Sequence, residues 1–228
     1  MVKQMFYLAK WFFGAKFFNQ KKPLQSVIFI SDKCNLACKH CNVYNYENPN
    51  IKTFEQIKEE LIYCYKQGSR FVDFEGGEPF IWEDGEKRID DLIDLAKSIG
   101  FYSCTITTNA QRPFINSHAD SIWVSLDGVG EYHERIRGKG AFAKLEQNIS
   151  TCNHKALSVN MAINTLNYES VAKTIEYAKN SPYIKSISLN FHTPFKGTEY
   201  LALDMEKRQE IIDMIISYKK KGYPIMNS

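Results

Sequence analysis

Residues 24–41 read LQSVIFISDKCNLACKHC, a short apolar run followed at once by three closely spaced cysteines. The run at 24–30 contains valine, isoleucine and phenylalanine, which favour a buried β-strand. Cys34, Cys38 and Cys41 follow it in the spacing C-x3-C-x2-C. Three thiols in one loop can converge on one metal centre, and soft thiolates select zinc, copper(I) or iron–sulfur clusters. This stretch therefore predicts a strand followed by a thiolate metal site.

The alternation of strand and helix continues along the chain. Runs rich in β-branched and aromatic residues predict strands, and longer amphipathic runs predict the helices between them. The expected strands are 24–30, 70–75, 101–107, 121–126, 157–163 and 184–191, and the expected helices lie near 53–67, 85–98, 142–152, 167–179 and 204–220. The third connection has only a turn-rich segment at 112–118. Such a repeat predicts parallel strands joined by right-handed crossovers.

Six such units in a chain of 228 residues suit an α/β fold, namely a partial (β/α)6 TIM-like barrel. A doubly wound open sheet is the alternative that this alternation leaves open. In a barrel, function is expected at the carboxyl ends of the strands. The unusual residues follow the first four expected strands, and they are the cysteines, Gly76-Gly77-Glu78-Pro79, Thr108-Asn109 and Asp127-Gly128.

The composition is that of an ordinary globular protein, with 44% hydrophobic and 24% charged residues. The 29 basic and 26 acidic residues are spread along the chain and give a formal net charge of +3, so no nucleic-acid partner is expected. The cysteines are not spaced as a disulfide framework, which indicates a reducing compartment and a cytoplasmic location. Cys64 and Cys104 are expected to be small buried side chains, and Cys152 to end a helix.

The first 22 residues are expected to form a separate segment ahead of a core domain at 23–228. Their apolar residues recur at helical spacing, which predicts an N-terminal amphipathic helix. One face of that helix would carry Met5, Leu8, Ala9, Phe12 and Phe13. Lys10 and Lys16 interrupt the apolar run, and neither a membrane span nor a cleavable signal is readable. We expect the helix to dock on the fold; the alternative is peripheral contact with a membrane.

The number of cysteines in the loop bears on the kind of metal site. An all-cysteine cluster usually has four thiolate ligands, and this loop supplies three. A four-iron cluster held by three cysteines keeps one iron open for an exogenous ligand, which suits chemistry better than electron transfer. The alternative is a non-catalytic zinc-binding interaction domain that uses the same cysteines and a histidine. His40 adjoins Cys41 and is poorly placed to complete that tetrahedron.

With His40 in the aromatic position, the cysteine loop resembles the C-x3-C-x-aromatic-C hallmark of radical S-adenosylmethionine (SAM) enzymes. Gly76-Gly77-Glu78-Pro79, one strand and helix later, resembles the family segment that contacts the SAM amino group. The resemblance runs from about residue 27 to the end of the chain. It implies one [4Fe-4S] cluster whose open iron chelates SAM. An electron from that cluster then cleaves SAM to a 5′-deoxyadenosyl radical, which abstracts hydrogen from a substrate.

Residues 123–138 resemble the fourth-strand region of the branch that contains anaerobic sulfatase-maturing and peptide-modifying enzymes. By that resemblance, Ser125 contacts the ribose or carboxylate of SAM, and Arg137 pairs with its carboxylate. The other implied SAM contacts are His40, Asn109, Asn164 and the backbone of Leu189. Asp127 is either a turn residue before Gly128 or a group near the substrate.

The resemblance also implies an electron donor such as flavodoxin or ferredoxin. The substrate is expected to be a peptide, a lipid or another sizeable molecule, and the reaction subtype stays open. No cysteine follows Cys152, so the auxiliary clusters of that branch are not encoded here. Residues 221–228 resemble the start of a further strand in longer relatives. We therefore expect either a fragment of a longer enzyme or a barrel that closes early.

Overall fold

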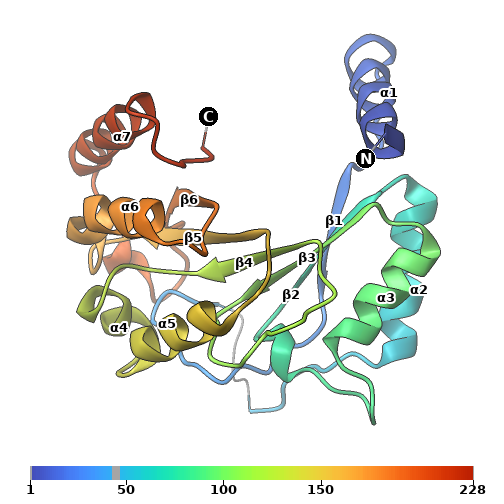
Figure 1. Ribbon diagram of the computed structural model, residues 1–228, viewed down its shortest axis with the longest axis horizontal. Helices are drawn as coiled ribbons and strands as arrows, with labels where there is room; N and C mark the ends of the chain where they lie inside the picture. The colour runs from blue at the N-terminus through green and yellow to red at the C-terminus, as the bar shows by residue number, and fades with distance from the viewer. Residues whose placement is uncertain (1, 43–46, 228) are drawn as a thin grey trace.

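The structure, a computed structural model, describes residues 2–42 and 47–227. It contains a six-stranded parallel sheet in which each strand pairs with its neighbour in sequence (Figure 1). The strands are β1 (Gln25–Phe29), β2 (Phe71–Glu75), β3 (Ser103–Thr108), β4 (Ser121–Ser125), β5 (Leu157–Ile163) and β6 (Ser186–Phe191). This sequential order confirms the predicted partial barrel, because a doubly wound sheet would reverse its order at a switch point.

Helices occupy the connections on the outer side of the sheet (Figure 1). The α-helices are α1 (Val2–Phe18), α2 (Phe54–Gln67), α3 (Ile89–Ile99), α4 (Glu131–Arg137), α5 (Ala141–Thr151), α6 (Val171–Asn180) and α7 (Met205–Lys220). Three short 3-10 helices are η1 (Pro79–Ile81), η2 (Tyr168–Ser170) and η3 (Glu199–Leu201). The β3–β4 connection is turn-rich, as predicted.

Three helices differ from the sequence expectation, and one of them, α6, begins at Val171 rather than near residue 167 because the 3-10 helix η2 occupies residues 168–170. α3 begins at Ile89 rather than at residue 85, because Asp84 and Lys87 form an antiparallel bridge ahead of it. The helical pattern does not predict α4, whose seven residues lie between Gly130 and Gly138 and are too few to show a period. The short helix matters because its last residue, Arg137, reaches the carboxyl end of the sheet.

The two faces of the sheet differ in chemistry. Val72 and Phe74 of β2 are buried in the core that also contains the apolar residues of α2 and α3. Asp73 and Glu75 alternate with them and therefore point to the inner face. Inner-face positions of β3 are also polar, as at Thr107. A barrel filled only for stability would carry apolar layers there, so this polar inner wall favours a binding role.

The end of the chain extends the sheet beyond β6. Ile225 pairs with Ile187 of β6 in a parallel bridge, and the N–H of Met226 donates to the Ile187 carbonyl at 2.9 Å. This pairing agrees with the expected start of a further strand at 221–228, of which the structure describes residues up to 227.

The N-terminal helix α1 contacts the body through two aromatic side chains. The Tyr7 hydroxyl donates to the carbonyl of Gly68, and Trp11 Nε1 donates to the carbonyl of Lys22 at 2.8 Å. Both rings combine an apolar surface with a polar group that finds a backbone acceptor. The helix is present as predicted, and it docks through these two residues.

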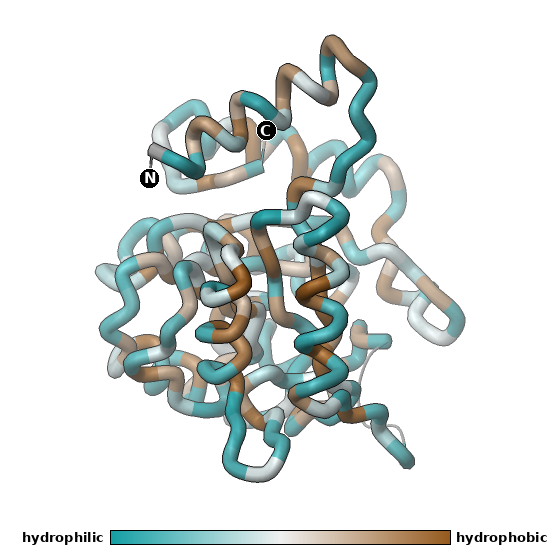
Figure 2. Tube along the Cα trace, turned by 90° about the vertical axis from the view of Figure 1, so that its right-hand side faces the viewer, coloured by the Kyte–Doolittle hydropathy of each residue, from teal (hydrophilic) through white to brown (hydrophobic). Residues whose placement is uncertain are grey.

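The face expected to dock lies outward instead. Met5 is 67% exposed, Phe12 50% and Phe13 54%, and Phe6 and Phe17 are exposed beside them. Figure 2 shows α1 standing off the rest of the molecule, with hydrophobic positions along its length. In the described part of the chain, no helix has the length and apolar character needed to cross a membrane.

Candidate functional site

The cysteine loop leaves the carboxyl end of β1 and returns to it. Ser31 pairs with Ile51 in an antiparallel bridge, and the N–H of Lys52 donates to the Ile30 carbonyl at 3.1 Å. Both ends of the loop are therefore fixed to the sheet. The loop faces a pocket of about 190 Å³ at the carboxyl ends of the strands.

This pocket gathers side chains from four strand ends. It is lined by Cys34, Cys38, His40, Cys41, Glu75, Gly76, Gly77, Thr107, Thr108, Asn109, Ser125 and Arg137. Most of the residues named from the sequence are thus in one place. Glu75 and Thr107 were not among them. The sequence pattern that could have identified Glu75 and Thr107 is the alternation of polar and apolar residues along their strands, which places both side chains on the inner face.

Gly76 and Gly77 pack against the cysteine loop itself. The N–H of Gly77 donates to the Ser31 carbonyl at 2.6 Å, and the N–H of Glu78 donates to the Lys33 carbonyl at 2.9 Å. A Cβ on either glycine would lie closer than 3.0 Å to one of these carbonyl oxygens. The sequence indicated close approach to a ligand, and the structure adds close approach to the loop backbone. The two glycines therefore position the cysteines as well as lining the pocket.

Glu78 ties this segment to β3. Its side chain is 1% exposed, and its carboxylate accepts hydrogen bonds from the Asn109 N–H and the Thr108 hydroxyl, both at 2.7 Å. Burial raises the pKa of Glu78, and these hydrogen bonds oppose that rise. Glu78 and Pro79 are outside the lining of the described pocket. A contact from Glu78 to the SAM amino group stays a prediction.

Asp127 is a buried anchor beneath the pocket. Its Oδ2 accepts from Arg137 Nε at 2.6 Å and lies 3.5 Å from His40 Nε2, and its Oδ1 accepts from the Ala162 N–H at 2.9 Å. Burial acts to raise the pKa of Asp127, but the charges of Arg137 and His40 hold it at about 2. These contacts join Asp127 to Arg137 and His40, and the two sequence alternatives for Asp127, a turn residue before Gly128 or a group near the substrate, stay predictions.

Arg137 links this anchor to the cysteines. Its side chain is 9% exposed and lines the pocket, with Nη1 3.8 Å from Cys38 Sγ. Burial acts to lower the pKa of Arg137, but the charges of Asp127, Cys38 and Cys41 and the hydrogen bond to Asp127 together raise it. The guanidinium can offset part of the negative charge of nearby thiolates. A pairing with the SAM carboxylate stays a prediction.

The thiols themselves are held in a partly buried setting. Burial raises the pKa of Cys34 and raises that of Cys38 to about 11. Asn109 Nδ2 lies 3.6 Å from Cys34 Sγ and donates to Asn35 Oδ1 at 2.8 Å. Metal binding would release protons from these thiols, because the thiolate is the ligand form.

The donor set fits an iron–sulfur cluster, because the three cysteines line one pocket and thiolates are the ligands of such clusters. Within residues 2–42 and 47–227, no three Cys, His, Asp or Glu side chains are grouped so that they could hold one metal ion. Zinc–sulfur bonds of about 2.3 Å would bring three sulfurs close together, whereas the thiolates of a cluster bind different irons. Among the described atoms, the buried Nδ1 of His40 has no hydrogen-bond partner, and His40 lines this pocket. It offers a polar contact to a bound group.

Two residues that the family resemblance named as SAM contacts form hydrogen bonds within the protein. Asn164 is fully buried, and its side chain donates to the Ala162 carbonyl and accepts from the Leu166 N–H, both at 2.9 Å. The Leu189 backbone forms two hydrogen bonds with the side-chain amide of Asn227, at 2.8 and 2.9 Å. Neither residue lines the described pocket. Their roles toward SAM stay predictions.

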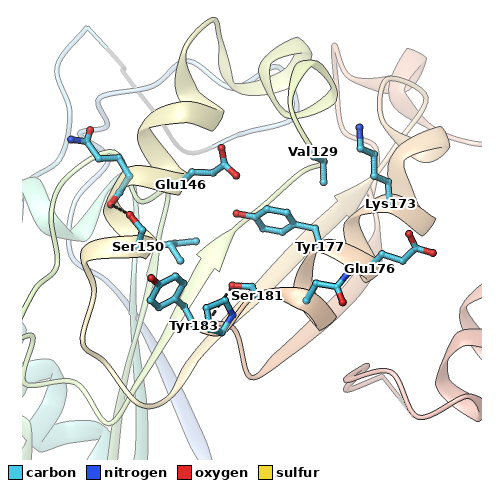
Figure 3. A pocket seen from close by; sticks show the side chains of 12 residues that line it. Val129, Glu146, Ser150, Lys173, Glu176, Tyr177, Ser181 and Tyr183 are labelled. Carbon is cyan, nitrogen blue, oxygen red and sulfur yellow. Dashed lines mark hydrogen bonds between the residues drawn. The ribbon is translucent and has the colours of Figure 1, made fainter.

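A larger cavity of about 650 Å³ lies on the outside of the barrel, between α5 and α6 (Figure 3). The Tyr177 ring projects into it from α6, and Glu146 borders it from α5. Its lining contains no cysteine or histidine and none of the residues named from the sequence. The residues that line the smaller pocket at the strand ends therefore favour it as the functional site.

The family follows from a direct match. Residues 28–178 match the model of the radical SAM superfamily, and the chain belongs to that superfamily. Its members use a [4Fe-4S] cluster and SAM, which agrees with the cofactors that the family resemblance of the two motifs implied.

Three relatives illustrate the breadth of this similarity. The chain is 24% identical to Fe-coproporphyrin III synthase of Methanosarcina barkeri, over 92% of this chain and 55% of that protein. It is 22% identical to the sporulation killing factor maturation protein SkfB of Bacillus subtilis, over 83% and 48%. The crystal structure of Streptococcus suis SuiB bound to S-adenosylmethionine superimposes with a TM-score of 0.72 and 20% identity, over 96% and 52%. The chain thus spans about half the length of each.

Proposed function

We propose that this chain is the catalytic core of a radical SAM enzyme in which Cys34, Cys38 and Cys41 hold one [4Fe-4S] cluster. The observation that carries the proposal is a single pocket, at the carboxyl ends of the strands, that the three cysteines share with the Gly76-Gly77 backbone. When bound, the cluster supplies the electron that cleaves SAM to methionine and a 5′-deoxyadenosyl radical, which abstracts hydrogen from the substrate.

The residues of the chain hold and orient SAM in this proposal. Gly76 and Gly77 line the pocket with backbone alone, and the amino group of SAM would bind beside them. Asn109 and Ser125 present an amide and a hydroxyl from the ends of β3 and β4. Arg137, fixed by Asp127, contributes positive charge to the same pocket. Together these groups keep SAM in one orientation against the cluster.

The substrate is proposed to be a sizeable molecule, with a peptide as the first candidate, which enters along the inner face of the sheet. Val27 and Phe29 of β1 alternate with the buried Ile28 and are 49% and 44% exposed. They offer an apolar wall beside the pocket. A peptide is supported by the names of two similar proteins, the maturation protein SkfB and SuiB bound to its precursor peptide SuiA. The electron donor would be a flavodoxin or ferredoxin.

A cytoplasmic location with peripheral membrane contact through α1 is part of the same proposal. The outward face of α1 carries exposed phenylalanines, and Lys16 lies among them at 5.5 Å from the Phe12 ring. Aromatic rings with interspersed lysines suit the interface of an anionic membrane. Flotation with vesicles of phosphatidylglycerol and phosphatidylcholine tests this contact. The intact chain should float with the vesicles, and a chain that starts after Lys22 should not. Equal flotation of the two chains would contradict membrane contact through α1.

Anaerobic reconstitution with iron and sulfide tests the enzyme proposal. The wild-type chain should bind four irons and yield 5′-deoxyadenosine from SAM with dithionite as reductant. Cys38→Ala should lose both signals, because it removes a cluster ligand. Cys104→Ala is the matched control, since Cys104 is fully buried in the core away from the pocket. Loss in both variants, or retention in Cys38→Ala, would contradict the ligand assignment.

A further inference from the structure

Two carboxylates, Asp73 and Glu75, stand together on the inner face of β2. They are two residues apart in one strand, so their side chains point the same way. Glu75 lines the pocket of the three cysteines, and Asp73 lies one layer nearer the amino end of the strands. The pair therefore borders the place where a substrate would meet the bound SAM.

No basic side chain of the described residues neutralises the pair, and the two carboxyl groups hydrogen-bond to each other. Asp73 is 9% exposed, and its Oδ1 has no hydrogen-bond partner among the described atoms. The Thr107 hydroxyl donates to Glu75 Oε1 at 3.4 Å. No ion pair formed by the described residues includes either carboxylate. A buried carboxylate without a cation or a full set of donors is costly, so a ligand that supplied both would be favoured.

We infer that Asp73 and Glu75 bind the cationic group, an alkylammonium or a guanidinium, of the substrate. The inference rests on the proposed function, because it takes the cysteine pocket to be the place of reaction. An ammonium offers three donors and a guanidinium five, which the two carboxylates can share. Bound there, the cation would hold the adjoining carbon chain against the SAM site.

The neighbouring strand supports a ligand with an alkyl stem. Val27 of β1 is in register with Asp73, and Phe29 is in register with Glu75. Both are exposed on the inner face, at 49% and 44%. A lysine-like or arginine-like group can lay its methylenes on these apolar side chains while its charged end meets the carboxylates. A hard cation such as Ca²⁺ fits less well, because it takes six to eight oxygen ligands.

The test uses the full chain and isothermal titration with n-pentylammonium. The wild-type chain should bind this probe, and 1-pentanol, which lacks the charge, should bind at least about tenfold more weakly. Asp73→Asn and Glu75→Gln, made singly, should each weaken probe binding by about tenfold or more. Glu86→Gln removes an exposed surface carboxylate as a control and should bind as the wild type does. Equal binding by wild type and both site variants would overturn the inference.

Two further arms identify the source of the cation and separate this inference from the function it rests on. Binding of a blocked tripeptide with a central lysine, more tightly than n-pentylammonium, would support a peptide substrate; tighter binding of the free amine would support a small amine. SAM binding by the reconstituted wild-type chain is measured in parallel. Absence of SAM binding would refute the proposed function. SAM binding with probe affinity unchanged in both variants would refute only the cation site.

Discussion

Gly77→Ala tests whether the Gly-Gly segment positions the cysteines. The new Cβ would overlap the Lys33 carbonyl oxygen, which is backbone and cannot rotate away. The cysteine loop must then shift, at the expense of the hydrogen bonds to Ser31 and Lys33 at 2.6 and 2.9 Å. Overpacking costs about 1–3 kcal/mol. Weakening of these two hydrogen bonds costs about 1 kcal/mol more in total. We expect a total loss of about 2–4 kcal/mol and poor iron loading.

The assay pairs thermal unfolding with iron content after anaerobic reconstitution. For a chain of this size the expected loss lowers Tm by roughly 5–15 °C. Gly85→Ala is the control, because its Cβ meets nothing within 4 Å and only its φ of +59° is unfavourable. That control should cost about 1 kcal/mol and keep its iron. Full iron loading and a wild-type Tm in Gly77→Ala would refute the argument that this glycine holds the loop.

Three further perturbations follow from the contacts described above. Asp127→Ala leaves the buried Arg137 without its partner, so urea unfolding should show a loss of about 3–5 kcal/mol, and a loss below 1 kcal/mol would count against the anchor. Burial and the charge of Glu75 raise the pKa of Asp73 to about 7, above its ordinary 3.8. Protonation of Asp73 therefore stabilises the fold at low pH, and this contribution is lost as the pH rises through 7. Asp73→Asn should therefore exceed the wild type in unfolding free energy by up to about 4 kcal/mol at pH 8 and match it near pH 4, whereas a pH-independent difference would contradict the shift. Tyr7→Phe removes the hydroxyl that reaches Gly68, so limited proteolysis should release α1 faster than in the wild type, and an unchanged rate would show that this bond does not hold the helix.

Local patterns were sufficient to predict the strands and the cysteine loop. Each strand is a β-rich run bounded by turn residues, and the three cysteines lie within eight positions, so both signals are contained in short stretches. The resemblance to the family rested on motifs at adjacent strand ends, which the parallel sheet brings to one edge. The pocket that joins Cys34, Gly76 and Ser125 was predictable for this reason.

Contacts between distant parts of the chain were not predictable in the same way. The pairing of Asp127 with Arg137 depends on α4, a helix too short to show a period. The outward face of α1 depends on which of its aromatic rings finds a backbone acceptor, and Tyr7 and Trp11 do so. A glutamate in a Gly-Gly-Glu-Pro segment would be expected in an exposed turn, and only the structure shows Glu78 buried against β3. Each case is decided by tertiary packing, which a single sequence does not display.

Electron paramagnetic resonance of the reconstituted, dithionite-reduced chain tests the central claim most directly. In the proposed assignment three cysteine ligands leave one iron open, so addition of SAM should change the spectrum of the reduced cluster, and Cys38→Ala should show no such cluster. S-adenosylhomocysteine and methionine, added separately, report which part of SAM the pocket requires. A wild-type cluster whose spectrum is the same with and without SAM would contradict the account.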